Sequence, residues 1–196
     1  NGLFKKKCTL KSNTTTGEGF YIAGAGSCTF KDSVVITKLD GPGMFFGGGI
    51  VLIDSASNLY FSSGIGGTAA FQKLTRAGTA PINIENGPDN LYLGPNNTFN
   101  SNFSYTGKAI TLYGNTFQGI TTIKLNGNTT TSSYGGNVFN GSTLIQDSSS
   151  TAHSLYLATG TADDYNGDVT FVQKGTGVSL YPAYTKNSTF AKNITL

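Results

Sequence analysis

The sequence contains few of the residues that catalytic and nucleic-acid-binding sites depend on. Among 196 residues there is no tryptophan, one methionine, one histidine (His153) and one arginine (Arg76), and only 12% of the residues are charged. The net charge is +3 and the only basic run is Lys5–Lys7, whereas a nucleic-acid-binding face needs a continuous basic surface. The ten acidic residues are mostly isolated, so clustered carboxylates for acid–base chemistry are missing. We therefore expect that the protein has no nucleic-acid partner and is not an enzyme.

Long apolar runs are also missing, so we expect no membrane span. We find no signal-peptide pattern within the sequence, which opens at Asn1 without methionine. This start is typical of a processed product or of a fragment of a longer protein.

The two cysteines, Cys8 and Cys28, have matching contexts, Cys-Thr-Leu and Cys-Thr-Phe. If Leu10 is an early copy of the position of Phe30, the two cysteines stack on successive coils of a repeat, at a strand spacing that a disulfide accepts. The sequence leaves two interpretations open, a disulfide or two stacked core thiols.

Small polar residues dominate what is present. Glycine (27), threonine (27), serine (18) and asparagine (18) make up nearly half of the chain. All four are poor helix formers and suit strands and tight turns. Short period-two runs replace any helical stripe, which indicates an all-β protein.

One pattern recurs along the chain: an aromatic residue followed four and six residues later by another strand-type side chain. Its copies begin about 23 residues apart on average, a period typical of repeats that stack on their neighbours. The eight copies begin at Phe30, Phe46, Phe71, Phe99, Phe117, Phe139, Tyr165 and Phe190.

Between these copies lie shorter runs such as Leu91-Tyr92-Leu93, and turns rich in glycine. Asn-Gly pairs supply the backbone angles that sharp corners need, and they occur at Asn86, Asn126, Asn140 and Asn166. We predict a right-handed parallel β-helix with about 20–25 residues per coil. The alternative is an antiparallel β-sandwich of short strands.

We expect residues 1–196 to form a single β-helical segment whose N-terminal part, residues 1–29, is less regular. The last repeat stops at Leu196 with no capping segment after it. Because an open β-helix end exposes unpaired strand edges, we expect a fragment of a much longer repetitive chain, or a homo-oligomer or filament partner that covers the end.

Three segments share one pattern: residues 137–143 (NVFNGST), 164–171 (DYNGDVTF) and 188–195 (STFAKNIT). They resemble the repeats of very large cell-surface proteins of Bacteroidota. These repeats carry the pattern Thr-Phe-Asn-Gly-(Asn/Asp)-(Val/Ile)-Thr-(Phe/Val), and the resemblance is clearest from residue 95 to 196. Upstream, Phe46 and Phe71 lack the Asn-Gly. The resemblance implies an extracellular adhesin or filamentous appendage exported by the type 9 secretion route, and it carries over no catalytic residues.

The densest acidic cluster holds the one candidate metal site. Asp164, Asn166 and Asp168 have the spacing that begins a calcium loop, but Val169 replaces the glycine that should follow. A looser calcium site therefore competes with a polar corner whose side chains bond turn amides. No other cofactor is indicated. His153 follows a run of serines, which predicts an exposed corner.

Tyrosines at the centres of the Leu-Tyr-Leu runs should point outward, because side chains alternate across a strand. Tyr60, Tyr92 and Tyr156 are the candidate surface ladder, suited to stacking cell-surface glycans or to stabilising neighbouring coils. The sequence thus favours a structural segment of a secreted bacterial surface adhesin or filament, acting in attachment and self-assembly. A carbohydrate-binding β-helix is the second hypothesis, and a β-helical polysaccharide lyase or hydrolase the third.

Overall fold

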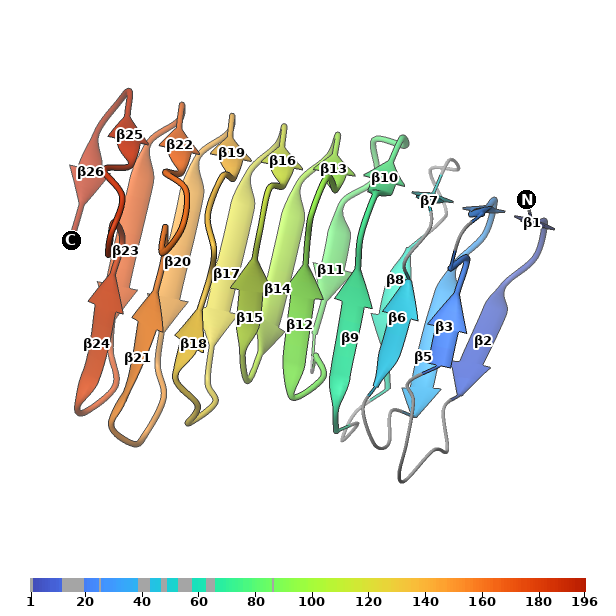
Figure 1. Ribbon diagram of the computed structural model, residues 1–196, viewed down its shortest axis with the longest axis horizontal. Coiled ribbons are helices and arrows are strands. Elements are labelled where there is room, and N and C mark those ends of the chain that lie inside the picture. Colours follow the sequence, from blue (N-terminus) through green and yellow to red (C-terminus); the bar gives the residue numbers. More distant parts are fainter. Residues whose placement is uncertain are drawn as a thin grey trace.

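The protein is an all-β solenoid. The structure, a computed structural model, describes residues 2–11, 20–24, 26–38, 43–46, 49–52, 58–62, 66–85 and 87–196. These residues contain no helix. Their strands stack in parallel along one long axis, with the two chain ends at opposite ends of the stack (Figure 1). Asn86, one of the expected corner asparagines, lies outside the described residues.

The chain winds repeatedly through three faces, each built of one or two parallel sheets that extend along the long axis. The first face is nine-stranded in the described residues. Its strands are β1 (Gly2–Phe4), β4 (Ser27–Phe30), β7 (Gly49–Leu52), β10 (Leu74–Arg76), β13 (Thr98–Phe99), β16 (Thr116–Phe117), β19 (Val138–Phe139), β22 (Asp164–Tyr165) and β25 (Thr189–Phe190).

The second face consists of two sheets that meet between β8 and β11. They are β2 (Cys8–Lys11), β5 (Val34–Lys38) and β8 (Leu59–Phe61), then β11 (Ile82–Ile84), β14 (Phe103–Gly107), β17 (Thr121–Leu125), β20 (Thr143–Asp147), β23 (Val169–Gln173) and β26 (Ile194–Thr195).

The third face also consists of two sheets, which meet between β15 and β18. They are β3 (Phe20–Ile22), β6 (Met44–Phe46), β9 (Thr68–Phe71), β12 (Asn90–Leu93) and β15 (Ile110–Leu112), then β18 (Thr131–Ser132), β21 (His153–Tyr156) and β24 (Val178–Tyr181).

The parallel β-helix expected from the repeat is confirmed, and the antiparallel sandwich is excluded because the strands pair in parallel with the next coil. Equivalent residues on successive coils are 18 residues apart at Asn97 and Asn115 and 26 apart at Asn137 and Asp163. This range is slightly wider than the expected 20–25. Residues 1–29 contribute β1–β4 to the same sheets. The handedness of the coil stays a prediction.

The core contains a row of parallel aromatic rings on the first face. Neighbouring rings lie 4.8–5.0 Å apart and are tilted by only 3–7°. All but the last are almost completely buried. Such offset ring pairs add to the apolar burial that stabilises each coil against the next. The row is Phe99, Phe117, Phe139, Tyr165 and Phe190.

Two of the eight predicted copies are out of phase with this row. Phe46 and Phe71 stack on each other at 4.3 Å, but they belong to β6 and β9 of the third face. On the first face, Leu52 and Arg76 take the aromatic register instead. Arg76 is fully buried there, and its guanidinium donates to the carbonyl oxygen of Ala80. The aromatic spacing therefore marked the first face correctly at Phe30 and from Phe99 onward, but not at Phe46 and Phe71.

The Asn-Gly pairs at Asn140 and Asn166 form corners between the first and second faces, whereas the pair at Asn126 lies between the second and third faces. A Cβ atom at Gly141 would lie 2.4 Å from the carbonyl oxygen of Gly119, and one at Gly167 would lie 2.4 Å from that of Gly141. Only glycine permits corners this close. The asparagine side chains bond along the stack, because Asn166 Nδ2 donates to Asn140 Oδ1 at 2.8 Å. The corner residues of the repeat therefore serve coil stacking.

Candidate functional site

A buried row of amide side chains follows the corner between the third and first faces. Asn97 Nδ2 donates to Asn115 Oδ1 at 2.8 Å, and Asn115 Nδ2 donates to Asn137 Oδ1 at 2.7 Å. Asn137 Nδ2 donates to Asp163 Oδ1 at 2.8 Å. Each of the four is 1% exposed. The row satisfies its members' polar groups inside the core, and it ends on a carboxylate where an amide would continue it.

Asp163 is an acid in an apolar setting. The pKa of Asp163 is raised to about 6, chiefly by burial and in part by the nearby Asp164 carboxylate, while hydrogen bonds from Asn137 oppose the shift. Such a pKa suits a general acid, but the amide row occupies the carboxylate, which is 1% exposed. The shift therefore belongs to a structural group.

A second buried polar cluster joins Asp147 and His153, which corrects the expectation that His153 lies at an exposed corner. His153 Nε2 lies 2.8 Å from Asp147 Oδ2, and His153 Nδ1 lies 2.9 Å from the carbonyl oxygen of Thr151. Ser149 Oγ donates to Asp147 Oδ1 at 2.6 Å. The serine thus bonds the carboxylate and not the imidazole, so this order differs from a Ser-His-Asp triad, in which the histidine takes the serine proton. The cluster fastens the turn between β20 and β21.

The three calcium candidates have separate partners. Asp164 is exposed on β22. Asn166 lies at the corner, where its side chain donates to that of Asn140. Asp168 Oδ1 accepts hydrogen bonds from the backbone and side-chain nitrogens of Asn193 on the next coil, at 3.2 and 3.0 Å. In the described part of the chain, no group of three or more His, Cys, Asp or Glu side chains could hold a metal ion. This geometry favours the polar-corner interpretation.

The cysteines do not stack in the expected register. Cys8 pairs with Val34 on the second face, and Cys28 pairs with Gly2 and Ile50 on the first. Both are free thiols, half-buried against the core. Burial and the Cys28 thiol raise the pKa of Cys8, which disfavours the reactive thiolate. A disulfide between them stays a prediction.

The candidate tyrosine ladder is divided between two faces. Tyr92 and Tyr156 lie on β12 and β21 of the third face, whereas Tyr60 lies on β8 of the second. The partners of Tyr156 are other residues: its ring stacks on Tyr181 at 4.9 Å and contacts Tyr184 at 4.3 Å. The outward direction was correctly inferred, but the membership of the ladder was not.

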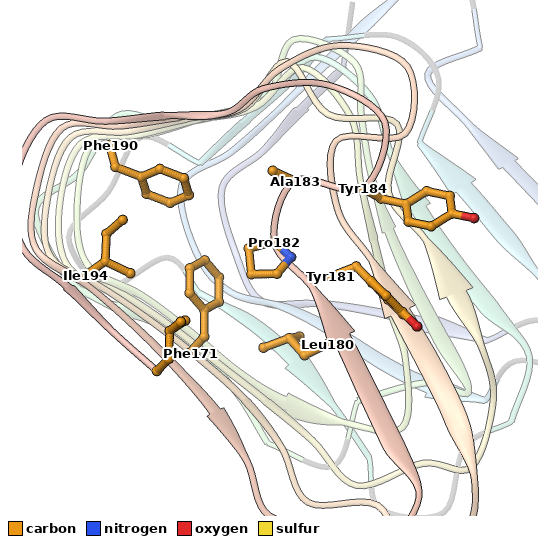
Figure 2. Close-up of a pocket in the computed structure, with 9 residues that line it drawn as sticks. Phe171, Leu180, Tyr181, Pro182, Ala183, Tyr184, Phe190 and Ile194 are labelled. Carbon is orange, nitrogen blue, oxygen red and sulfur yellow. The ribbon is translucent and has the colours of Figure 1, made fainter.

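An apolar pocket of about 370 Å³ opens at the C-terminal end of the core (Figure 2). It lies beside Phe190, the last ring of the row, and the only polar side-chain groups among its lining residues are the hydroxyls of Tyr181 and Tyr184. These two rings form one wall and point away from the core (Figure 2). The other lining residues are Phe171, Leu180, Pro182, Ala183, Phe190, Ile194 and Leu196.

Comparison of the chain with protein-family models, curated proteins and solved structures gave no match. A search of the described residues for a helix of the length and apolarity needed to span a membrane found none. The surface tyrosines of the third face are the candidate functional site, because Tyr134, Tyr181 and Tyr184 are exposed whereas the buried polar rows are not.

Proposed function

We propose that this chain is a structural segment of a secreted bacterial cell-surface adhesin or filamentous appendage, of the kind that Bacteroidota export, acting in attachment and self-assembly. The observation that carries the proposal is the unbroken parallel stack of the first face, from β1 to β25. In a parallel stack the hydrogen bonds between coils run along the long axis, so the chain is stiff in the direction in which an appendage extends.

The side-chain rows support the same role. The ring row, the buried amide row and the glycine corners all join one coil to the next. Among the described residues, the buried carboxylates of Asp147 and Asp163 serve the same framework, the first by holding a turn and the second by ending the amide row. These side chains stabilise coils, and such a framework is what a spacer between a cell and a surface requires.

Attachment and assembly can be measured directly. We expect beads coated with the full chain to be retained under flow on bacterial or polysaccharide surfaces, and we expect the sedimentation coefficient of the chain to rise with concentration. Beads that wash off every surface, together with a single concentration-independent species, would contradict the proposal. Release of new reducing ends or unsaturated uronates from a polysaccharide panel would instead support the enzyme alternative.

A further inference from the structure

Tyrosines gather on one side of the solenoid. All ten tyrosines fall within the described residues: Tyr105 and Tyr165 are buried, Tyr60 is on the second face, and Tyr21 lies on β3 of the third face. The remaining six lie on strands of the third face or within three residues after them. We call these six the tyrosine face: Tyr92, Tyr113, Tyr134, Tyr156, Tyr181 and Tyr184.

The third face also lacks charge. As far as the structure describes them, the strands β3, β6, β9, β12, β15, β18, β21 and β24 contain no Asp, Glu, Lys or Arg, and His153 is turned inward. The second face differs, since Lys124 is exposed on β17. Between the rings the third face carries small hydroxyl and amide side chains, such as Ser154, Ser179 and Asn90.

The rings of the tyrosine face are not all used in stacking coils. In the core row the tilt between rings is 3–7°, whereas Tyr184 is tilted by 54° to Tyr156 and by 69° to Tyr181. Tyr113 and Tyr134 likewise meet at 63°. A tilted ring is not covered by its neighbour as a parallel one is, so part of its π surface stays available.

Gly160 leaves room for one of these rings, that of Tyr134. A Cβ atom at residue 160 would lie 2.2 Å from the ring of Tyr134, so the ring occupies the space that a side chain there would fill. Half of Tyr134 is nevertheless exposed, as is half of Tyr184. Both rings are therefore held against the solenoid and still open to solvent.

From these observations we infer that the tyrosine face binds a neutral polysaccharide lying along the long axis. The C–H groups of a sugar ring carry partial positive charge and pack on the negative faces of aromatic rings, while phenol and hydroxyl side chains bond the sugar hydroxyls. The missing charge disfavours acidic polymers. This inference deepens the proposed attachment function, on which it rests, by naming the class of surface that is bound.

A protein partner fits the face less well. The large exposed apolar residues of the third face are all tyrosines, among them Tyr134, Tyr181 and Tyr184, whereas the exposed aliphatic residues Ile120 and Ile194 lie elsewhere. The cores of protein interfaces are more apolar than the surface around them. A row of phenols on successive coils matches a linear, hydroxyl-rich polymer better.

The test is affinity electrophoresis of the full chain through gels that contain a neutral glucan, xylan, mannan or soluble chitin derivative, with polygalacturonate as the acidic comparison. We expect retardation by at least one neutral polymer and none by polygalacturonate. Tyr134→Ala and Tyr184→Ala should each weaken binding about tenfold, the loss typical of a binding-site tyrosine. The matched control is Tyr60→Ala, which removes a ring that is 47% exposed on another face.

Circular dichroism and thermal melting of each variant separate lost binding from lost folding, and Tyr134→Phe serves as a second variant that keeps the ring. The inference is overturned if no neutral polymer retards the chain, or if Tyr60→Ala weakens binding as much as Tyr134→Ala does. It is also overturned if the tyrosine variants change the sedimentation coefficient but leave retardation by the polymers unchanged. If the beads fail to attach but neutral polymers still retard the chain, the proposed attachment role is contradicted and the binding inference is supported. Beads that attach although no neutral polymer retards the chain would support the attachment role and contradict the binding inference.

Discussion

The buried carboxylate that ends the amide row predicts an unusual effect of pH on stability. The pKa of Asp163 rises from 3.8 to about 6 on folding, and each unit corresponds to about 1.4 kcal/mol. Because the folded pKa is the higher one, the stabilising contribution of the protonated form is fully present below pH 3.8 and is lost as the pH rises through 6. At pH 8 the ionised carboxylate therefore lowers the free energy of unfolding by about 3 kcal/mol relative to its protonated form.

Asp163→Asn should remove this penalty. The amide keeps the oxygen that accepts the hydrogen bonds from Asn137 and carries no charge at any pH. We expect the substitution to raise the free energy of unfolding by up to about 3 kcal/mol at pH 8 and to have almost no effect at pH 4. Urea denaturation followed by circular dichroism at both values measures the difference.

The control is Asp164→Asn, the same change at the next residue, whose side chain is exposed. It should leave the free energy of unfolding nearly unchanged at pH 8. The reasoning is refuted if Asp163→Asn is no more stable than the wild type at pH 8, or if its gain is equally large at pH 4.

Three further substitutions test the coil-stacking rows, each by urea denaturation. Tyr165→Phe should stabilise the protein by about 1 kcal/mol, because the buried hydroxyl of Tyr165 has no hydrogen-bond partner; a loss of stability would reveal one. Gly167→Ala should cost about 1–3 kcal/mol because its Cβ meets the carbonyl of the coil below, whereas Gly24→Ala, with nothing within 4 Å, should be tolerated. Asp147→Ala should cost about 3–5 kcal/mol, since it leaves His153 buried without its partner, and a neutral result would contradict the pairing.

The sequence predicted the architecture because stacking requires the same residue types at the same place on each coil. From Phe99 to Phe190 the aromatic spacing follows the ring row directly. It also holds at Phe30, but it failed at Phe46 and Phe71, which make an equally good stack on a different face. The spacing of the aromatic residues gives the number of coils, but it does not show on which of the three faces a given aromatic residue lies.

Two features of the site leave a recognisable pattern in the sequence. Asn97, Asn115 and Asn137 each stand two residues before a ring of the core row, as Asp163 does before Tyr165, so the amide row is visible as a repeat in its own right.

Period-two counting from Thr143 through Ile145 would have turned Asp147 inward, where a buried acid needs a partner such as His153. The tyrosine face had no comparable signal, because Tyr113, Tyr134 and Tyr184 follow their strands at different distances. Only the folded corners bring them to one side.

The direction of the hydrogen bonds between coils determines how the molecule responds to force. A pull between the chain ends acts along these bonds and loads one coil's set at a time, instead of shearing all of them together. Each detached coil of 18–26 residues would release roughly 60–90 Å of chain before the next is loaded. Because each coil contacts only its neighbours, the remaining coils stay folded. The solenoid would therefore lengthen stepwise under tension and dissipate the energy of a sudden pull.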